Sequence, residues 1–285
     1  MPRRSDETSA QAHCRALVAT HDHDRYLTAL YAGDAARGGL FALYALNVEL
    51  ARIREATSEP MLGEIRLAWW REAMDGLYAG TARPHPVVEA LAPHIAAGHL
   101  PQAPFMAMIE ARINDLYDET PADIEGLERH LEATAGNLAL LALALCGVEE
   151  GRQALARAAG LAWGVTGIVR AVAFHARAHR LYLPTQELTC AGLTAARVFA
   201  GESGPALRPV LRKLAARAAA HADEAARLAT TAPRKALPAL LPVVLARDYL
   251  TRLAAMDYEA RAIAMTKGAA LRQAKLFWAA LKGKI

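Results

Sequence analysis

The sequence predicts an all-α fold, and three observations support this. Hydrophobic residues make up 54% of the 285 residues and charged residues 22%, and Ala and Leu dominate where sheet proteins would have Val, Ile and Thr. Gly and Pro punctuate the chain and leave helix-length segments between them. Within several of these segments, apolar residues recur every three or four positions. No fixed-period repeat, low-complexity tract or linker is present, so we expect one domain over residues 1–285.

Three interior helices and one C-terminal helix are expected. Residues 40–56 carry an apolar stripe at helical spacing, and residues 123–146 include TAGNLALLALALC, which is apolar all round as in a central helix. Residues 152–175 form the third helix. The final segment, 267–285, places Ala274, Phe277, Trp278, Leu281 and Ile285 on one stripe beside lysines and an arginine. Such a stripe either packs on its own domain or lies on a membrane surface.

Composition limits the classes of function. The three cysteines lie far apart, which suggests neither a zinc site nor a disulfide framework. Residues 1–11 have no apolar run behind their arginines, and the longest apolar run, 138–146, is too short to span a bilayer, so we expect a cytoplasmic protein. Residues 205–285 form a basic region, with 15 Lys and Arg against 5 Asp and Glu. Because no nucleic-acid motif or Gly-rich phosphate loop accompanies it, we expect no nucleic-acid partner.

Four segments carry a resemblance to a known family. They are LYALNVELARIRE, then WWREAMDGLYAG with HPVVEAL, then TAGNLALL, then GLAWGVTGIVRAVAFHARAHRLYLP. In this order they resemble the squalene/phytoene synthase family of the isoprenoid-synthase fold, most strongly over residues 24–184. The resemblance implies an antiparallel helical bundle around a central cavity. Family members join two prenyl diphosphates head to head there, and Asp-rich motifs on facing helices bind the required Mg²⁺.

The sequence departs from the family at these acidic motifs. The first motif has two adjacent acids and a third three residues later, and these positions here are Ala51, Arg52 and Glu55. The second has an Arg-Asp pair and an Asp four residues later, and here it reads Arg170, Ala171 and His175. Mg²⁺ requires hard oxygen ligands, which one remaining carboxylate does not supply. We therefore expect no metal, no cofactor and no catalytic residues of the family type.

The basic residues of the motifs are kept, and their number is increased by two replacements. By the resemblance, Arg37 and Tyr44 keep family positions, and the basic turn before the extended YLP segment is also kept. Replacing acids by Arg52 and His175 makes the cavity mouth basic, which suits direct binding of an anionic group. We expect an anion or diphosphate pocket that includes Arg37, Tyr44, Arg52, Arg170, His175, Arg180 and Tyr182.

The departures are similar to those of one subgroup of the family, an assembly factor of mitochondrial respiratory complex I that is thought to be non-catalytic. That similarity implies a binding protein whose partners are complex I subunits or assembly intermediates, with a prenyl or anionic lipid as ligand. It also implies a location at the inner face of the inner membrane.

Other interpretations stay open. One is an active prenyltransferase that anchors Mg²⁺ with Glu55 and either Asp115 or Asp118, and another is a peripheral binder of anionic lipid. Glu55 and Arg52 also fit ordinary ion pairing on a helix face. His175, with a second histidine four residues later, also fits a purely structural role.

Overall fold

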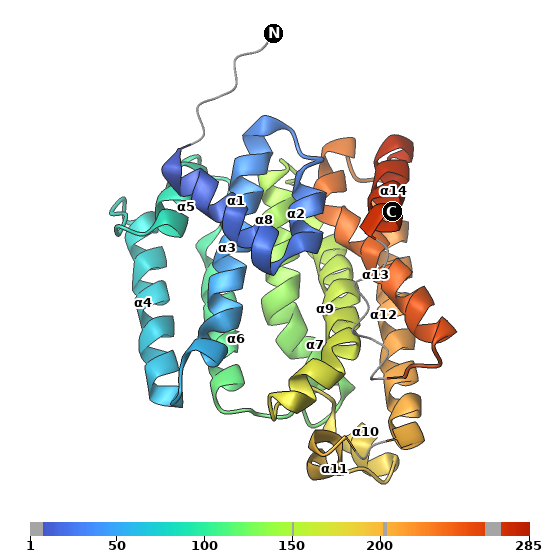
Figure 1. Ribbon diagram of the computed structural model, residues 1–285. Coiled ribbons are helices and arrows are strands. Elements are labelled where there is room, and N and C mark those ends of the chain that lie inside the picture. The colour runs from blue at the N-terminus through green and yellow to red at the C-terminus, as the bar shows by residue number, and fades with distance from the viewer. Residues whose placement is uncertain (1–7, 150, 202–203, 260–268) are drawn as a thin grey trace.

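The computed structural model of the protein is a bundle of long antiparallel helices (Figure 1). It describes residues 8–149, 151–201, 204–259 and 269–285. Within these ranges every regular element is helical, which confirms the predicted all-α fold. Most of the N-terminal segment 1–11 lies outside the described residues, as do Lys267 and Gly268 at the start of the predicted C-terminal helix.

The first half of the chain forms one side of the bundle. Its longest helix starts at Asp34, six residues before the predicted start. It includes Gly39, which packs closely, since an added Cβ would lie 2.6 Å from Leu145 Cδ2. The helix that starts at His23 is capped by Asp22, whose side chain accepts a hydrogen bond from the Arg25 amide. The helices of this half are α1 (Ser9–His21), α2 (His23–Ala29), α3 (Asp34–Ala56), α4 (Pro60–Tyr78), α5 (Pro86–Ala96) and α6 (Gln102–Leu116).

The predicted helix over 123–146 contains a π turn. Helix α7 (Ile124–Leu131) runs into the π-helical turn η1 (Glu132–Gly136) and then into α8 (Asn137–Leu145). At this turn the backbone lies against helix α9 (Arg152–Arg177), since a Cβ added to Gly160 would lie 2.5 Å from the Gly136 Cα. Single π turns often lie next to functional sites, and this one borders the central cavity.

Helix α9 is the central helix of the bundle. It packs against α8, α12 (Leu207–Ala229) and α13 (Leu237–Ala255). It is the one described helix that is long and apolar enough to cross a membrane by length and composition, and half of that window is buried inside the protein. Its apolar character is therefore also what a core helix requires.

The C-terminal helix closes the bundle next to the N-terminal helices. It is α14 (Ala269–Lys282), and its Arg272 donates a 2.7 Å hydrogen bond to Asp24 of α2. Asp24 is buried and also accepts from Arg170 and from the Tyr249 hydroxyl. The remaining short elements are α10 (Thr185–Cys190), α11 (Ala195–Phe199), η2 (Gly204–Ala206) and η3 (Arg234–Ala236).

Candidate anion-binding cavity

Small residues on one face of α9 leave room for a cavity at the middle of the bundle. Gly164, Gly167 and Ala171 follow one another at helical spacing and all line it. A Cβ added to Gly167 would meet no atom within 4 Å, so this position faces open space. On the facing elements Ala51 of α3 and Ala135 of the π turn are equally small. The cavity has a volume of about 290 Å³, at the lower limit for small-molecule sites.

Four of the five positions at which the resemblance places the family's acids meet across this cavity, and Arg52 is the exception. Ala51 and Glu55 are four residues apart on α3, and Ala171 and His175 are four apart on α9, so each pair shares one helical face. All four residues line the cavity. The sequence departures therefore lie where they change its chemistry.

Three arginines line the cavity, and each contacts a carboxylate. Arg25 comes from α2, Arg112 from α6 and Arg180 from the turn after α9. The guanidinium of Arg25 is paired with Asp22 at 2.7 Å and lies over the ring of Trp163, 5.5 Å from its centre. These groups are held in place by partners that do not depend on a ligand.

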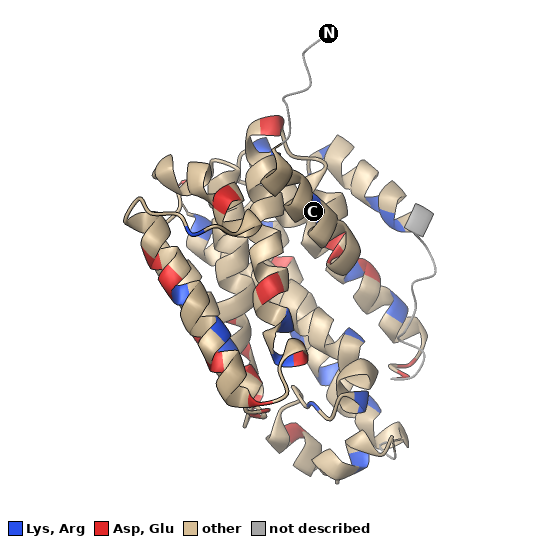
Figure 2. Ribbon diagram, turned by 60° about the vertical axis from the view of Figure 1, so that its left-hand side comes forward, with Lys and Arg blue, Asp and Glu red and all other residues tan. Residues whose placement is uncertain are grey.

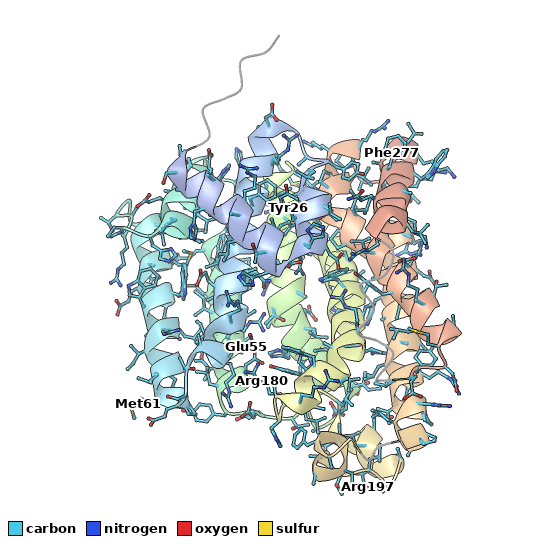
Figure 3. All side chains as sticks on the ribbon, in the orientation of Figure 1. Tyr26, Glu55, Met61, Arg180, Arg197 and Phe277 are labelled. Carbon is cyan, nitrogen blue, oxygen red and sulfur yellow. The ribbon has the colours of Figure 1, made fainter. Side chains whose placement is uncertain are left out.

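Arg180 is the least satisfied of the three cations. Its side chain is only 11% exposed, and its Nη1 reaches Glu55 at 3.4 Å, a long contact for an ion pair (Figure 3). Its Nε is buried and makes no hydrogen bond. The turn that presents it is fixed, because its amide donates to the His175 carbonyl at 2.9 Å and His179 adopts a left-handed φ of 53°. The geometry leaves a rigidly held guanidinium edge without a full complement of acceptors.

Neutral polar side chains complete the same end of the cavity. Burial, and then the nearby Arg180 charge, lower the pKa of His175 to about 4, so its imidazole is neutral at pH 7. Its ring packs edge-on against Tyr182, with centroids 4.9 Å apart. Behind them the buried Asp115 accepts a 2.9 Å hydrogen bond from Arg112. Burial, the Asp115 charge and a hydrogen bond to that carboxylate raise the pKa of Tyr182, so the phenol stays protonated and donates to Asp115.

These residues do not fit a Mg²⁺ ion. Each carboxylate near the cavity has an arginine partner: Glu55 has Arg180, Asp115 has Arg112, and Asp118 has Arg54 at 2.6 Å. Among the residues that the structure describes, no group of three or more His, Cys, Asp or Glu side chains could hold a metal. Mg²⁺ sites are built on carboxylates that are free to coordinate, together with water and phosphate oxygens. The donor set here suits an anion.

The predicted site residues are only partly brought together. Glu55, Ala51, Ala171, His175, Arg180 and Tyr182 line the cavity. Tyr44 is buried beside it and lines a small adjoining void of about 20 Å³.

The other three predicted cations lie elsewhere. Arg37 bonds the Ala32 carbonyl. Arg170 stacks on Tyr249, with its guanidinium carbon 4.2 Å from the ring centroid. Arg52 points to the outer side of α3, where it contacts His21 at 3.0 Å. It lines a separate groove of about 380 Å³ with Trp69 and His85.

Sequence reasoning missed two of the three cavity cations. Arg25 follows the cap at Asp22, and nothing in its local pattern indicates that it turns inward over Trp163. Arg112 lies three residues before Asp115, a spacing that signals an ion pair, yet Asp115 was considered as a possible Mg²⁺ anchor.

Comparisons with known proteins identify the family. The family model of squalene/phytoene synthase matches residues 18–273. A relative in Bos taurus, NADH dehydrogenase (ubiquinone) complex I, assembly factor 6, is 28% identical over 87% of this chain and 74% of its own length. Chloroplastic phytoene synthase 3 of Zea mays is 30% identical over 76% of this chain and 54% of its own.

Solved structures show the same fold. A dehydrosqualene synthase with bound ligand superposes with a TM-score of 0.84 at 19% identity, and 96% of this chain and 95% of that one are covered. The squalene synthase HpnC from Alicyclobacillus acidocaldarius gives a TM-score of 0.78 at 23% identity, covering 87% of this chain and 94% of that one. The expected fold and resemblance are confirmed.

Proposed function

The chain belongs to the squalene/phytoene synthase family, and from this premise we propose that it is a non-catalytic member that binds one anionic ligand and supports the assembly of respiratory complex I. The observation that carries the proposal is the incompletely bonded guanidinium of Arg180. Arg25 and Arg112 are neutralised by Asp22 and Asp115 just behind the cavity lining. Arg180 has only the 3.4 Å contact to Glu55 and a buried Nε without a hydrogen bond. A cavity of this kind attracts an anion directly, where the family's chemistry requires a metal between protein and diphosphate.

The ligand chemistry follows from the end of the cavity near Arg180. Its buried, unbonded Nε and the long contact to Glu55 leave donors for phosphate or carboxylate oxygens. The neutral imidazole of His175 adds a polar group beside it. Away from this end the lining includes Ala, Gly, Leu, Ile and Trp residues, with Asn47, Thr134 and the paired Arg25 among them, which leaves room for a short apolar group. A single prenyl phosphate or a similar lipid anion matches both parts.

A role in complex I assembly is supported by the relatives. Six of the similar proteins, from Bos taurus to Drosophila melanogaster, are named as complex I assembly factor 6 or its homologue. We propose the same kind of partner for this chain, with its site of action at the inner face of the membrane that holds the complex.

A binding experiment tests the cavity. The purified protein is titrated calorimetrically with farnesyl diphosphate, farnesyl monophosphate and inorganic pyrophosphate, each with Mg²⁺ and with EDTA, while pyrophosphate release is followed. We expect binding that EDTA leaves unchanged and no release. Arg180→Gln should weaken binding by about tenfold or more, since hydrogen bonds to charged groups contribute about 1.5–3 kcal/mol.

Two further variants sharpen the result. Gly167→Leu places a side chain in open space within the cavity and should abolish binding while the protein stays folded. Arg197→Gln is the matched control, because Arg197 is exposed on α11, far from Glu55 and Arg180 in Figure 3. Equal binding by the Gly167→Leu variant and the unchanged protein would contradict the assignment of the cavity.

The assembly role is tested in the native host. Deleting the gene should lower the amount of assembled NADH dehydrogenase on native gels, and the unchanged gene should restore it. The gene with Arg180→Gln should restore less assembled NADH dehydrogenase than the gene with Arg197→Gln. Unchanged enzyme levels after deletion, in several growth conditions, would refute the role.

The alternative of an active prenyltransferase has one specific observation in its favour. Glu55 does approach Arg180, and Asp115 lies close enough to act on His175 and Tyr182, so the carboxylates required by that interpretation are near one cavity. Mg²⁺-dependent release of pyrophosphate in the experiment above would establish it and remove the non-catalytic proposal.

A further inference from the structure

The C-terminal helix α14 turns most of its apolar residues to solvent. Leu276 is its buried anchor, at 1% exposure, while Phe277 and Trp278 are each 57% exposed and Leu281 is 56% exposed. These three, with Leu271, form what we call the α14 outer face. Figure 3 shows Phe277 on α14 at the outer edge of the bundle. Large aromatic side chains seldom gather on a soluble surface without a partner.

The inner face of α14 is firmly attached, so the outer face is not exposed by a loose helix. Arg272 bonds Asp24 at 2.7 Å and the Tyr249 hydroxyl at 3.0 Å. Lys275 pairs with the buried Asp248. These pairs use the cations on the inner side and hold the aromatic residues in a fixed outward orientation.

The charge around the outer face is positive. From residue 269 to the C-terminus α14 and its tail contain no Asp or Glu, and Figure 2 shows only basic residues among the coloured ones on this helix. Lys282 lies over the ring of Trp278, 5.8 Å from its centroid, and Lys284 follows it, exposed. Arg234 of η3 donates to the Ala280 carbonyl and adds a further cation at the end of the helix.

A neighbouring apolar edge extends the surface. Leu30 and Tyr31, at the end of α2, are 43% and 38% exposed. Tyr31 lines a groove together with Ala280 of α14 and the exposed Lys235. The exposed acid at this groove, Asp34, is paired with Arg37 at 3.0 Å.

We propose that the α14 outer face is a membrane-docking surface that seats the protein on an anionic lipid bilayer. Trp and Phe side chains on an amphipathic helix settle at the boundary of head groups and acyl chains, with lysines at the phosphates beside them. The stems of Lys282 and Lys284 are long enough for their ammonium groups to reach those phosphates while the aromatic rings are inserted. A protein partner for the same face would not require this concentration of cations.

The proposal is tested with the full chain and lipid vesicles alone, so it fails or stands independently of the cavity and of complex I. Sedimentation with vesicles of pure phosphatidylcholine is compared with vesicles containing about one third phosphatidylglycerol, at low and high salt. We expect binding to the anionic vesicles that high salt weakens. Brominated lipids should quench Trp278 fluorescence, and this quenching should be lost in a Trp278→Phe variant that still binds.

Variants locate the surface. Phe277→Ser with Trp278→Ser should reduce partitioning by about tenfold or more, and because both side chains are over half exposed, the unfolding temperature should be nearly unchanged. The matched control is Met61→Ser with Ile65→Ser, which removes two equally exposed apolar residues from α4 on another side of the bundle.

Two other occupants of the face are distinguishable outcomes that overturn the proposal. One is a second copy of the chain: equilibrium sedimentation would then show a dimer that the Phe277 and Trp278 variants dissociate. The other is a partner that is not an anionic bilayer. Equal, salt-independent binding to both kinds of vesicle would indicate neutral lipid, and no binding to either would indicate a protein partner. Vesicle binding that persists after the Phe277 and Trp278 substitutions would also overturn the proposal.

Discussion

Restoring two carboxylates should convert the cavity into a magnesium site. Ala51 and Ala171 face one another across it from α3 and α9, and Glu55 is already present. Replacing both alanines by Asp would place three carboxylates around one space. Because Asp is the ordinary ligand type for Mg²⁺, we expect the double variant to gain a metal-dependent increase in stability that the unchanged protein lacks.

The size of this increase follows from linkage. With a Kd of about 1 mM and about 10 mM Mg²⁺, ligand binding stabilises the folded state by RT ln 11, or about 1.4 kcal/mol. A chain of this length has an unfolding entropy of roughly 0.6 kcal/mol per degree, so the unfolding temperature should rise by about 2 °C. Adding Arg180→Gln should increase the response, because a cation next to the metal opposes its binding.

The assay is differential scanning fluorimetry over a Mg²⁺ series, with Ala51→Asn plus Ala171→Asn as the uncharged control. The reasoning is refuted if the unchanged protein already shows the same Mg²⁺-dependent shift, since its cavity would then hold a metal with the residues it has. It is also refuted if the double Asp variant folds, by circular dichroism, and shows no shift, since the two helices would then not face one cavity as described.

Three further outcomes are expected. The pKa of His175 is lowered from 6.5 to about 4 by burial and Arg180, so the unfolded chain takes up this proton first and stability falls as pH drops from 6.5 toward 4. Urea unfolding at pH 8 and pH 5 should show a loss of up to about 2 kcal/mol from this residue, which His175→Gln removes. Gly160→Ala should lower the free energy of unfolding by about 1–3 kcal/mol, because the added Cβ meets the backbone of the π turn. Gly167→Ala should raise this free energy by about 1 kcal/mol, because alanine has the higher helix propensity and the position faces open space. Equal effects of the two substitutions would contradict the packing described. Glu128→Gln should cost about 1–3 kcal/mol at pH 7, because this buried carboxylate accepts two hydrogen bonds from Arg217, and an unchanged denaturation midpoint would count against that pair.

Helical periodicity made the all-α fold predictable. The details that it did not predict, the start of α3 and the π turn, lie where helices pack closely against one another. The start of α3 was placed too late because the apolar stripe begins at residue 40, whereas the helix continues back through Gly39, which packs against Leu145. The π turn was missed because it lies where Gly136 packs against Gly160, and these two glycines are far apart in the sequence. Local propensity carries no information on either contact.

The candidate site was predictable in part for a geometric reason. Residues four apart share a helical face, so Ala51 with Glu55 and Ala171 with His175 could be assigned to one cavity together. Arg52 is rotated by about 100° from Ala51, and only the packed structure shows that this rotation carries it to the outer groove. Whether these residues bind an anion remains a prediction.

The network around Asp24 has a consequence for synthesis of the protein. Asp24 bonds Arg170, Tyr249 and Arg272, which lie 146, 225 and 248 residues later in the chain. At about 5–20 residues per second, a ribosome needs about 12 to 50 s to make the last of these after the first. During this time the carboxylate cannot be buried with its partners, and burial of an unpaired charge is strongly unfavourable. The set of Asp24 partners is therefore complete only when α14 has left the ribosome, and a chain truncated before α14 would lack one of the two cations that pair with this carboxylate.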